Sequence, residues 1–228
     1  RSFPIFGIDV QTPFKFKNSK NNLTYTPKIQ FVLSPGMSNS DRISNEDSSI
    51  NSYSINNNTN LNRYTGSDKL DNSKRINLSF NAINKNISAT ILQSYEFTNN
   101  SNYHYTHNER KLSDLLGNLK FNKNNFGTNY NIRYDNYNEF IKSQNLDIDY
   151  ENKLGFLQLS YLDQKSKTDE TIVSDNETLN YRIDTKKINK FSKLSYFGLY
   201  DIKNEINTES GLSYNYFDEC FGVNIDFK

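Results

Sequence analysis

The chain has no run of about 18 consecutive apolar residues, so a helical membrane span is not expected. It contains a single cysteine, Cys220, which excludes an internal disulfide bond. Glycine-rich phosphate loops, nucleophile elbows and paired-cysteine motifs are also missing. The charge is nearly balanced, with 27 basic and 26 acidic residues, and therefore gives no sign of a nucleic-acid partner. The sequence predicts neither an enzyme nor a bound cofactor.

Aromatic residues are abundant in a chain that is otherwise polar. Tyrosine and phenylalanine each occur 16 times, although the mean hydropathy is -0.84. Disordered chains are polar but poor in aromatic residues, so wholesale disorder does not fit. A membrane β-barrel explains both features, because its strands are apolar only on the face that meets lipid.

Apolar and polar residues alternate with a period of two in segments of about ten residues, the length of a tilted strand that spans a bilayer. Such segments recur along the whole chain, with polar residues at the intervening positions. Examples are Ile76, Leu78, Phe80 and Ala82; Leu157, Leu159 and Tyr161; and Phe221, Val223, Ile225 and Phe227. Counting both terminal segments, the pattern predicts about twelve strands.

The predicted links between strands alternate between short and long. Short turns are expected at 84–86, 123–125, 152–153, 188–190 and 217–219, and longer links at 35–72, 98–112, 136–142, 164–176 and 201–205. Outer-membrane barrels combine short periplasmic turns with long extracellular loops. The predicted fold is therefore all-β: a fragment of an antiparallel transmembrane β-barrel with short periplasmic turns and long extracellular loops.

Few residues suggest chemistry. His104 and His107 form an H-x-x-H pair beside Glu109, but two loop histidines are more often surface residues than metal ligands. Glu46 and Asp47 are adjacent and therefore point apart, which disfavours acid–base partnership. Aromatic residues at strand ends fit an interfacial girdle better than a sugar-binding platform. The segment 35–72 is a solvated loop or a functional one.

Three stretches resemble the C-terminal barrel region of the LptD family, which inserts lipopolysaccharide into the outer leaflet of the outer membrane. The stretches are YTPKIQFVLSPG with SNEDS (25–36 and 44–48), LNRYTGSDKLDNSKR (61–75) and GLSYNYFDECFGVNIDF (211–227). QSYEF (93–97) and LSDLLGNLKF (112–121) add weaker support. The resemblance covers nearly the whole chain in the expected order.

The chain departs from the family pattern in its last turn. Members often carry a vicinal cysteine pair there, whereas Glu219 precedes and Phe221 follows Cys220. The resemblance implies that Cys220 forms one disulfide bond to the N-terminal periplasmic domain, and a periplasmic position permits it. The alternative is a small buried thiol.

The resemblance further implies that residues 1–228 are the C-terminal part of a barrel whose N-terminal jellyroll, early strands and last strand lie elsewhere in a longer protein. The implied partners are lipopolysaccharide, outer-membrane lipid, a lipoprotein plug of the LptE type and a periplasmic bridge protein of the LptA type. The loop residues expected to line the lumen or touch the plug are Asn45, Glu46, Asp47, Asn62, Arg63, Gly66 and Asp68.

Two other functions share the strand pattern. A porin-like channel or a TonB-dependent receptor would show the same alternation and the same loop asymmetry. A secreted adhesin or soluble β-sandwich would be extractable from membranes. Only the family-like stretches favour outer-membrane lipopolysaccharide assembly over these alternatives.

Overall fold

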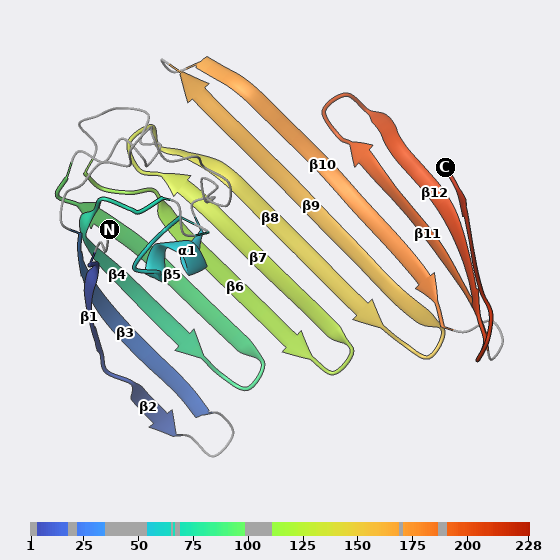
Figure 1. The fold of residues 1–228 in the computed structure, drawn as a ribbon, viewed down its shortest axis with the longest axis horizontal. Coiled ribbons are helices and arrows are strands. Elements are labelled where there is room, and N and C mark those ends of the chain that lie inside the picture. Colours follow the sequence, from blue (N-terminus) through green and yellow to red (C-terminus); the bar gives the residue numbers. More distant parts are fainter. Residues whose placement is uncertain are drawn as a thin grey trace. The chain divides into compact units, whose positions relative to one another are not determined.

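The computed structural model describes residues 4–17, 22–34, 54–64, 66, 69–98, 111–168, 171–186 and 191–228. These residues form thirteen strands and one short helix (Figure 1). The elements are β1 (Phe6–Gln11), β2 (Phe14–Lys17), β3 (Asn22–Leu33), α1 (Ile55–Thr59), β4 (Lys74–Ile83), β5 (Ile87–Glu96), β6 (Leu115–Lys123), β7 (Phe126–Asp135), β8 (Phe140–Glu151), β9 (Gly155–Thr168), β10 (Thr171–Thr185), β11 (Ser192–Asp201), β12 (Ile206–Phe217) and β13 (Gly222–Phe227). The prediction of an all-β antiparallel fold is confirmed.

The chain divides into two compact units. The first holds residues 1–118 and 133–139, and its strands pair antiparallel in the order β1, β3, β4, β5. The second holds residues 119–132 and 140–228, with the antiparallel order β8, β9, β10, β11, β12, β13. Strands β6 and β7 contribute residues to both units.

No helix among the described residues is both long and apolar enough to cross a membrane. The single helix, α1, has five residues and was not predicted from the sequence, because one turn is too short to show a helical period. It begins after Ser54, whose side chain accepts a hydrogen bond from the Asn57 backbone N–H over 3.3 Å.

Proline explains why the structure has thirteen strands rather than the predicted twelve. β1 and β2 both pair with β3, and the register continues unchanged across Thr12 and Pro13, which separate them. The Thr12 N–H still donates to the Pro27 carbonyl over 3.3 Å. Pro27, opposite Thr12, has no N–H to return this bond, so the ladder is interrupted there and the pairing with β3 divides into β1 and β2.

Several predicted turns lie where the sequence places them. β4 ends at Ile83 and β5 begins at Ile87, which confirms the turn at 84–86. Asn124, in the turn between β6 and β7, has φ of 52°, a left-handed conformation that asparagine tolerates. The turn expected at 188–190 lies outside the described residues.

The predicted long link at 164–176 is wrong. β9 continues to Thr168 and β10 begins at Thr171, so most of that segment is paired strand. Its polar composition resembles a loop, but polar residues face each other across the hairpin, as with Lys165 opposite Asp175. The links at 136–139 and 202–205 have only four residues each, so the predicted strict alternation of long and short links is also corrected.

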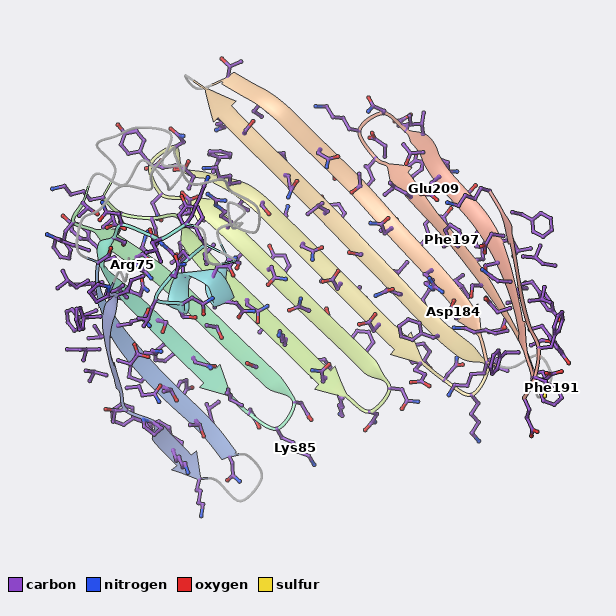
Figure 2. All side chains as sticks on the ribbon, in the orientation of Figure 1. Arg75, Lys85, Asp184, Phe191, Phe197 and Glu209 are labelled. Carbon is purple, nitrogen blue, oxygen red and sulfur yellow. The ribbon has the colours of Figure 1, made fainter. Side chains whose placement is uncertain are left out.

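The first unit buries polar side chains and exposes apolar ones. On β4, Arg75 and Asn77 are buried, whereas Leu78 is 53% and Phe80 is 43% exposed. β5 shows the same arrangement, with Ser94 buried and Ile91 exposed. In Figure 2 the side chains project to both sides of the strands. The exposed apolar face of such an inverted sheet is favourable only in contact with apolar surroundings.

Candidate functional site

The candidate site is a polar network between the sheet of the first unit and the segment that follows β3. Helix α1 and the residues after it fold over β4 and β5 (Figure 1). They cover the polar face of these strands, whose side chains alternate with the outward apolar ones. The segment is therefore attached to the sheet mainly by hydrogen bonds and ion pairs, beside the few buried apolar side chains of this face, Val32 and Leu92.

The last carbonyl groups of α1 are bound by side chains of the sheet. Asn77 Nδ2 donates to the Asn58 carbonyl over 2.6 Å, and Gln30 Nε2 donates to the Thr59 carbonyl over 2.9 Å. Arg75 Nη2 donates to the carbonyl of Asn60 over 2.5 Å. Helix C-terminal carbonyls lack partners within the helix, so the sheet supplies the missing donors.

Four buried charges lie beside the helix. Arg63 contacts Asp71 through two nitrogens, at 2.5 and 3.2 Å, and Glu96 Oε2 at 3.1 Å. Arg75 Nη1 contacts Asp71 Oδ2 at 3.0 Å. Each of the four residues is at most 2% exposed. We call Arg63, Asp71, Arg75 and Glu96 the charge network; it contains two positive and two negative side chains.

Neighbouring groups complete the hydrogen bonds of Glu96. The Ser73 hydroxyl donates to Glu96 Oε2 over 2.6 Å, and the Lys74 backbone N–H and the Thr98 hydroxyl donate to Oε1 over 2.9 and 2.6 Å. A buried carboxylate is tolerated only when its oxygens are bonded in this way. The carboxylate thus joins the covering segment to both β4 and β5.

Asn62 holds the loop that leads from Arg63 to Asp71. Its side-chain oxygen accepts hydrogen bonds from the N–H groups of Tyr64 and Asp71, over 3.3 and 3.0 Å, and its amide donates to the Lys69 carbonyl over 3.1 Å. Gly66 has φ of 87°, which few other residues adopt. Burial raises the pKa of the Tyr64 hydroxyl, so it stays neutral at pH 7.

The charge network specifies where the covering segment docks. Buried ion pairs add little net stability because desolvation offsets their attraction, but removing one partner costs roughly 3–5 kcal/mol. Any other docking position would leave a buried charge without its partner. The arrangement can therefore fix one position of the segment on the sheet, and nothing in it suggests bond-making chemistry.

The structure describes part of the predicted loop site. Asn62 and Arg63 lie in the buried site and Gly66 in the turn above it, whereas Asn45, Glu46, Asp47 and Asp68 lie outside the described residues. His104 and His107 also lie outside them. Asp71, Arg75 and Glu96 were not predicted. A signal existed, because the turn at 84–86 sets the register that places Arg75 opposite Glu96.

Cys220 lies in a separate feature, the turn between β12 and β13. Its thiol is free and exposed. Asp218 Oδ1 accepts hydrogen bonds from the N–H groups of Cys220 and Phe221 over 2.9 and 2.8 Å, and these bonds lower the pKa of the Asp218 carboxyl. The turn therefore presents Cys220 to the surroundings; the alternative of a buried thiol is wrong.

A protein-family model connects these features to a known family. The model is that of LptD, LPS transport system D, and it matches residues 1–216. No curated protein matches the chain. The matched range contains the inverted sheet, the covering segment and the whole charge network. The chain belongs to the LptD family.

Proposed function

We propose that this chain forms part of the wall of an outer-membrane translocon that inserts lipopolysaccharide into the outer leaflet. The LptD family is a transport and assembly family for lipopolysaccharide, which supports the substrate class. The proposal adds the outer membrane of a Gram-negative bacterium as the location and passage through a barrel as the route.

The inverted sheet is the observation that carries this proposal. Ile29, Phe31 and Leu33 on β3 are 40–51% exposed, while Gln30 between them is 3% exposed. In water such an apolar face would promote aggregation, whereas in a bilayer it is solvated by lipid. The polar face then borders an aqueous interior through which a sugar-bearing lipid head group can move.

The chain would act within a longer barrel. Sheet edges cannot face lipid, because each unsatisfied backbone group there costs several kcal/mol. We propose that residues 1–228 are the C-terminal part of the barrel domain and that other strands of the parent protein close it. A periplasmic jellyroll, a bridge protein of the LptA type and an LptE-type lipoprotein plug would complete the route.

The covering segment would shape the lumen or contact the plug. We assign this role to Asn62, Arg63 and Gly66, together with Asn45, Glu46, Asp47 and Asp68 of the same loop. The burial of Arg63 and the hydrogen bonds of Asn62 support a fixed loop. Replacing Arg63 and Asp68 together should release the plug in a co-purification assay; unchanged recovery of the plug would contradict this role.

Cys220 would join the barrel to the N-terminal periplasmic domain through one disulfide bond. Its exposure at a hairpin tip supports an intermolecular or interdomain bond. Non-reducing electrophoresis of the parent protein should show a mobility shift that Cys220→Ser abolishes. Identical mobility of the two proteins would leave Cys220 as a free thiol.

Depletion of the parent protein tests the proposed function directly. Newly made lipopolysaccharide is pulse-labelled and the fraction at the cell surface is measured after depletion. We expect surface delivery to stop while lipopolysaccharide accumulates inside the envelope. Continued delivery with reduced solute uptake would instead identify a porin-like channel or a TonB-dependent receptor.

A further inference from the structure

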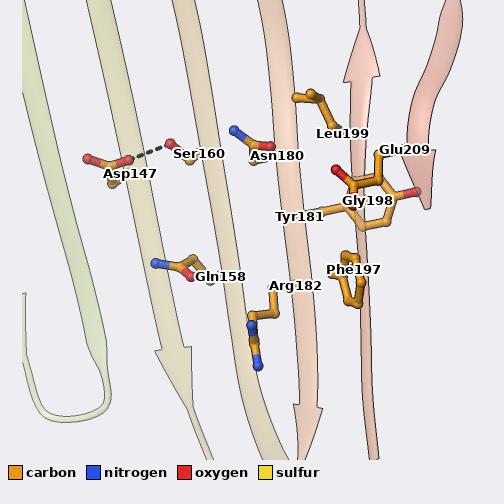
Figure 3. A pocket seen from close by; sticks show the side chains of 10 residues that line it. All are labelled: Asp147, Gln158, Ser160, Asn180, Tyr181, Arg182, Phe197, Gly198, Leu199 and Glu209. Atoms are coloured by element: carbon orange, nitrogen blue, oxygen red, sulfur yellow. Dashed lines mark hydrogen bonds between the residues drawn. The ribbon is translucent and has the colours of Figure 1, made fainter. Parts of the chain in front are cut away.

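A pocket lies on the sheet of the second unit and shares no residue with the charge network, which belongs to the first. It has a volume of about 360 Å³, within the range of roughly 300–1,000 Å³ for small-molecule sites. Figure 3 shows side chains from β8 to β12 around it. We call this the β8–β12 pocket; its lining includes Asp147, Gln158, Asn180, Arg182, Phe197 and Glu209.

Strand register brings these side chains together in two rows. In one row Asp147 lies opposite Ser160, Ser160 opposite Asn180, Asn180 opposite Leu199 and Leu199 opposite Glu209. In the next row Gln158 lies opposite Arg182, and Arg182 opposite Phe197. Residues two apart on a strand share a face, so both rows face the same side of the sheet.

Phe197 places an aromatic ring on the polar face of the sheet, and the backbone of the neighbouring strand β12 leaves room for this ring. It lies opposite Gly211, where an added Cβ would come within 2.6 Å of the Phe197 ring. A β-bulge between β11 and β12 follows directly at Leu199 and Tyr200. Bulges redirect side chains and are frequent beside functional sites. The glycine therefore lets the Phe197 ring lie against the backbone of β12, and the bulge shifts the register just beyond it.

The polar groups of the pocket are suited to hydroxyl groups. Asp147 accepts a hydrogen bond from the Ser160 hydroxyl over 2.6 Å, which orients its carboxylate. Among the described residues, no hydrogen bond occupies the side-chain amides of Gln158 and Asn180, and both residues are exposed. Each amide offers both donors and an acceptor, as sugar hydroxyls require.

The charges of the pocket disfavour an anion. Asp147 and Glu209 are acidic, and Arg182 is the basic lining residue. Arg182 Nε already donates to Asp184 over 3.0 Å. Lys228 Nζ likewise lies 3.3 Å from Glu209, so both basic groups near the pocket already have acidic partners and a phosphate would find no unpaired one among them. The apolar and aromatic lining side chains, Tyr181, Phe197 and Leu199, are also too few for a stable protein interface of roughly 800 Å² per partner.

We infer that the β8–β12 pocket binds a neutral sugar ring of the saccharide carried by the transported lipid, with Phe197 stacked on the ring. An aromatic face is electron-rich and attracts the C–H groups on the apolar face of a sugar ring. This inference rests on the proposed function, since the ligand is the saccharide part of the same cargo. The open, wet pocket gives weak binding, which lets the cargo leave again.

Saturation-transfer NMR tests the inference with the full parent protein in detergent micelles. The probe is core oligosaccharide released from the bacterium's own lipopolysaccharide by mild acid, with inorganic phosphate as the charged comparison. We expect saturation transfer from the protein to the oligosaccharide. Inorganic phosphate should not reduce this signal. Phe197→Leu should weaken binding roughly three- to tenfold, the value of one lost aromatic contact.

Tyr150→Leu is the matched control, because this exposed aromatic residue lies on β8 three positions after Asp147 and points to the opposite face. It should bind the oligosaccharide like the unchanged protein, and heat-modifiable gel mobility must show that both variants are folded. Equal binding by Phe197→Leu, or binding that phosphate displaces, would overturn the inference.

Photo-crosslinking in living cells extends the test to the lipid-linked saccharide. With Leu199→p-benzoylphenylalanine, irradiation should give an adduct recognised by antibody against the core saccharide. An adduct with a protein alone would assign the pocket to a plug and overturn the inference. If no saccharide adduct forms but depletion of the parent protein still stops lipopolysaccharide delivery, the pocket inference is rejected and the proposed function stands.

Discussion

Single side chains decide whether the covering segment stays docked. Removing the Glu96 carboxylate leaves Arg63 without one of its two buried acidic partners. We expect Glu96→Ala to weaken docking by roughly 3–5 kcal/mol, the cost of breaking a buried pair. Trypsin added to the folded protein should then cleave after Arg63 and Lys69 much faster than in the unchanged protein.

Lys74→Ala is the control for this cleavage experiment. Lys74 is the neighbour of Arg75 on β4, but its side chain is exposed and its contact with Glu96 is made through the backbone N–H. The control should leave cleavage unchanged. Equal cleavage of both variants would mean that the charge network does not hold the segment.

The turn at Cys220 depends on pH through Asp218. Hydrogen bonds from the N–H groups of Cys220 and Phe221 lower the pKa of the Asp218 carboxyl. Because the pKa is lower in the folded state, the ionised Asp218 carboxylate stabilises the turn at pH values above about 3.9, the pKa of an unfolded aspartate. This stabilisation is lost as the pH falls through the folded-state pKa. The amide NMR signals of Cys220 and Phe221 should titrate with a midpoint below 3.9, and Asp218→Ala should remove that titration.

At the scale of elements, two hairpins use the same five-residue pattern. Asp135 to Glu139 and Asp201 to Glu205 both read D-x-x-N-E. In each, the aspartate accepts a hydrogen bond from the backbone N–H of the asparagine and a second one from its side-chain amide. The glutamates that end the turns have φ of 53° and 56°.

This left-handed conformation can be tested at Glu205. Glycine adopts it without a steric penalty, whereas a branched side chain does not. We expect Glu205→Gly to raise the free energy of unfolding by up to about 1 kcal/mol and Glu205→Val to lower it by about 1–2 kcal/mol, in urea titrations. Glu219→Gly should bring no gain, because Glu219 is not among the described residues with positive φ.

The sequence predicted elements better than their contacts. Alternation placed β4 and β5 and their turn, because a period of two survives when one face is uniformly polar. It failed at β9 and β10, where both faces turn polar while pairing continues. It also left out Asp71, which contacts Arg63 across a loop whose path no periodic pattern describes. Arg75 and Glu96 could have been paired from the turn alone.

At the scale of the whole molecule, the exposed apolar face should meet lipid. An arginine in contact with the middle of a bilayer costs roughly 2–4 kcal/mol in a β-barrel. We therefore expect Leu78→Arg to reduce the folded fraction recovered from outer membranes. Ser79→Arg, one residue along β4 and on the other face, should be tolerated. Heat-modifiable gel mobility measures both, and equal recovery would contradict a lipid-facing surface.

The charge network also determines how the attachment of the covering segment responds to salt concentration. Its four charges are balanced and at most 2% exposed, so dissolved ions cannot reach and screen them as they screen surface pairs. Attachment of the covering segment should therefore be nearly the same in dilute and in salty surroundings. A loop held by surface ion pairs would loosen as salinity rises, whereas this one keeps its place when the environment of the cell changes.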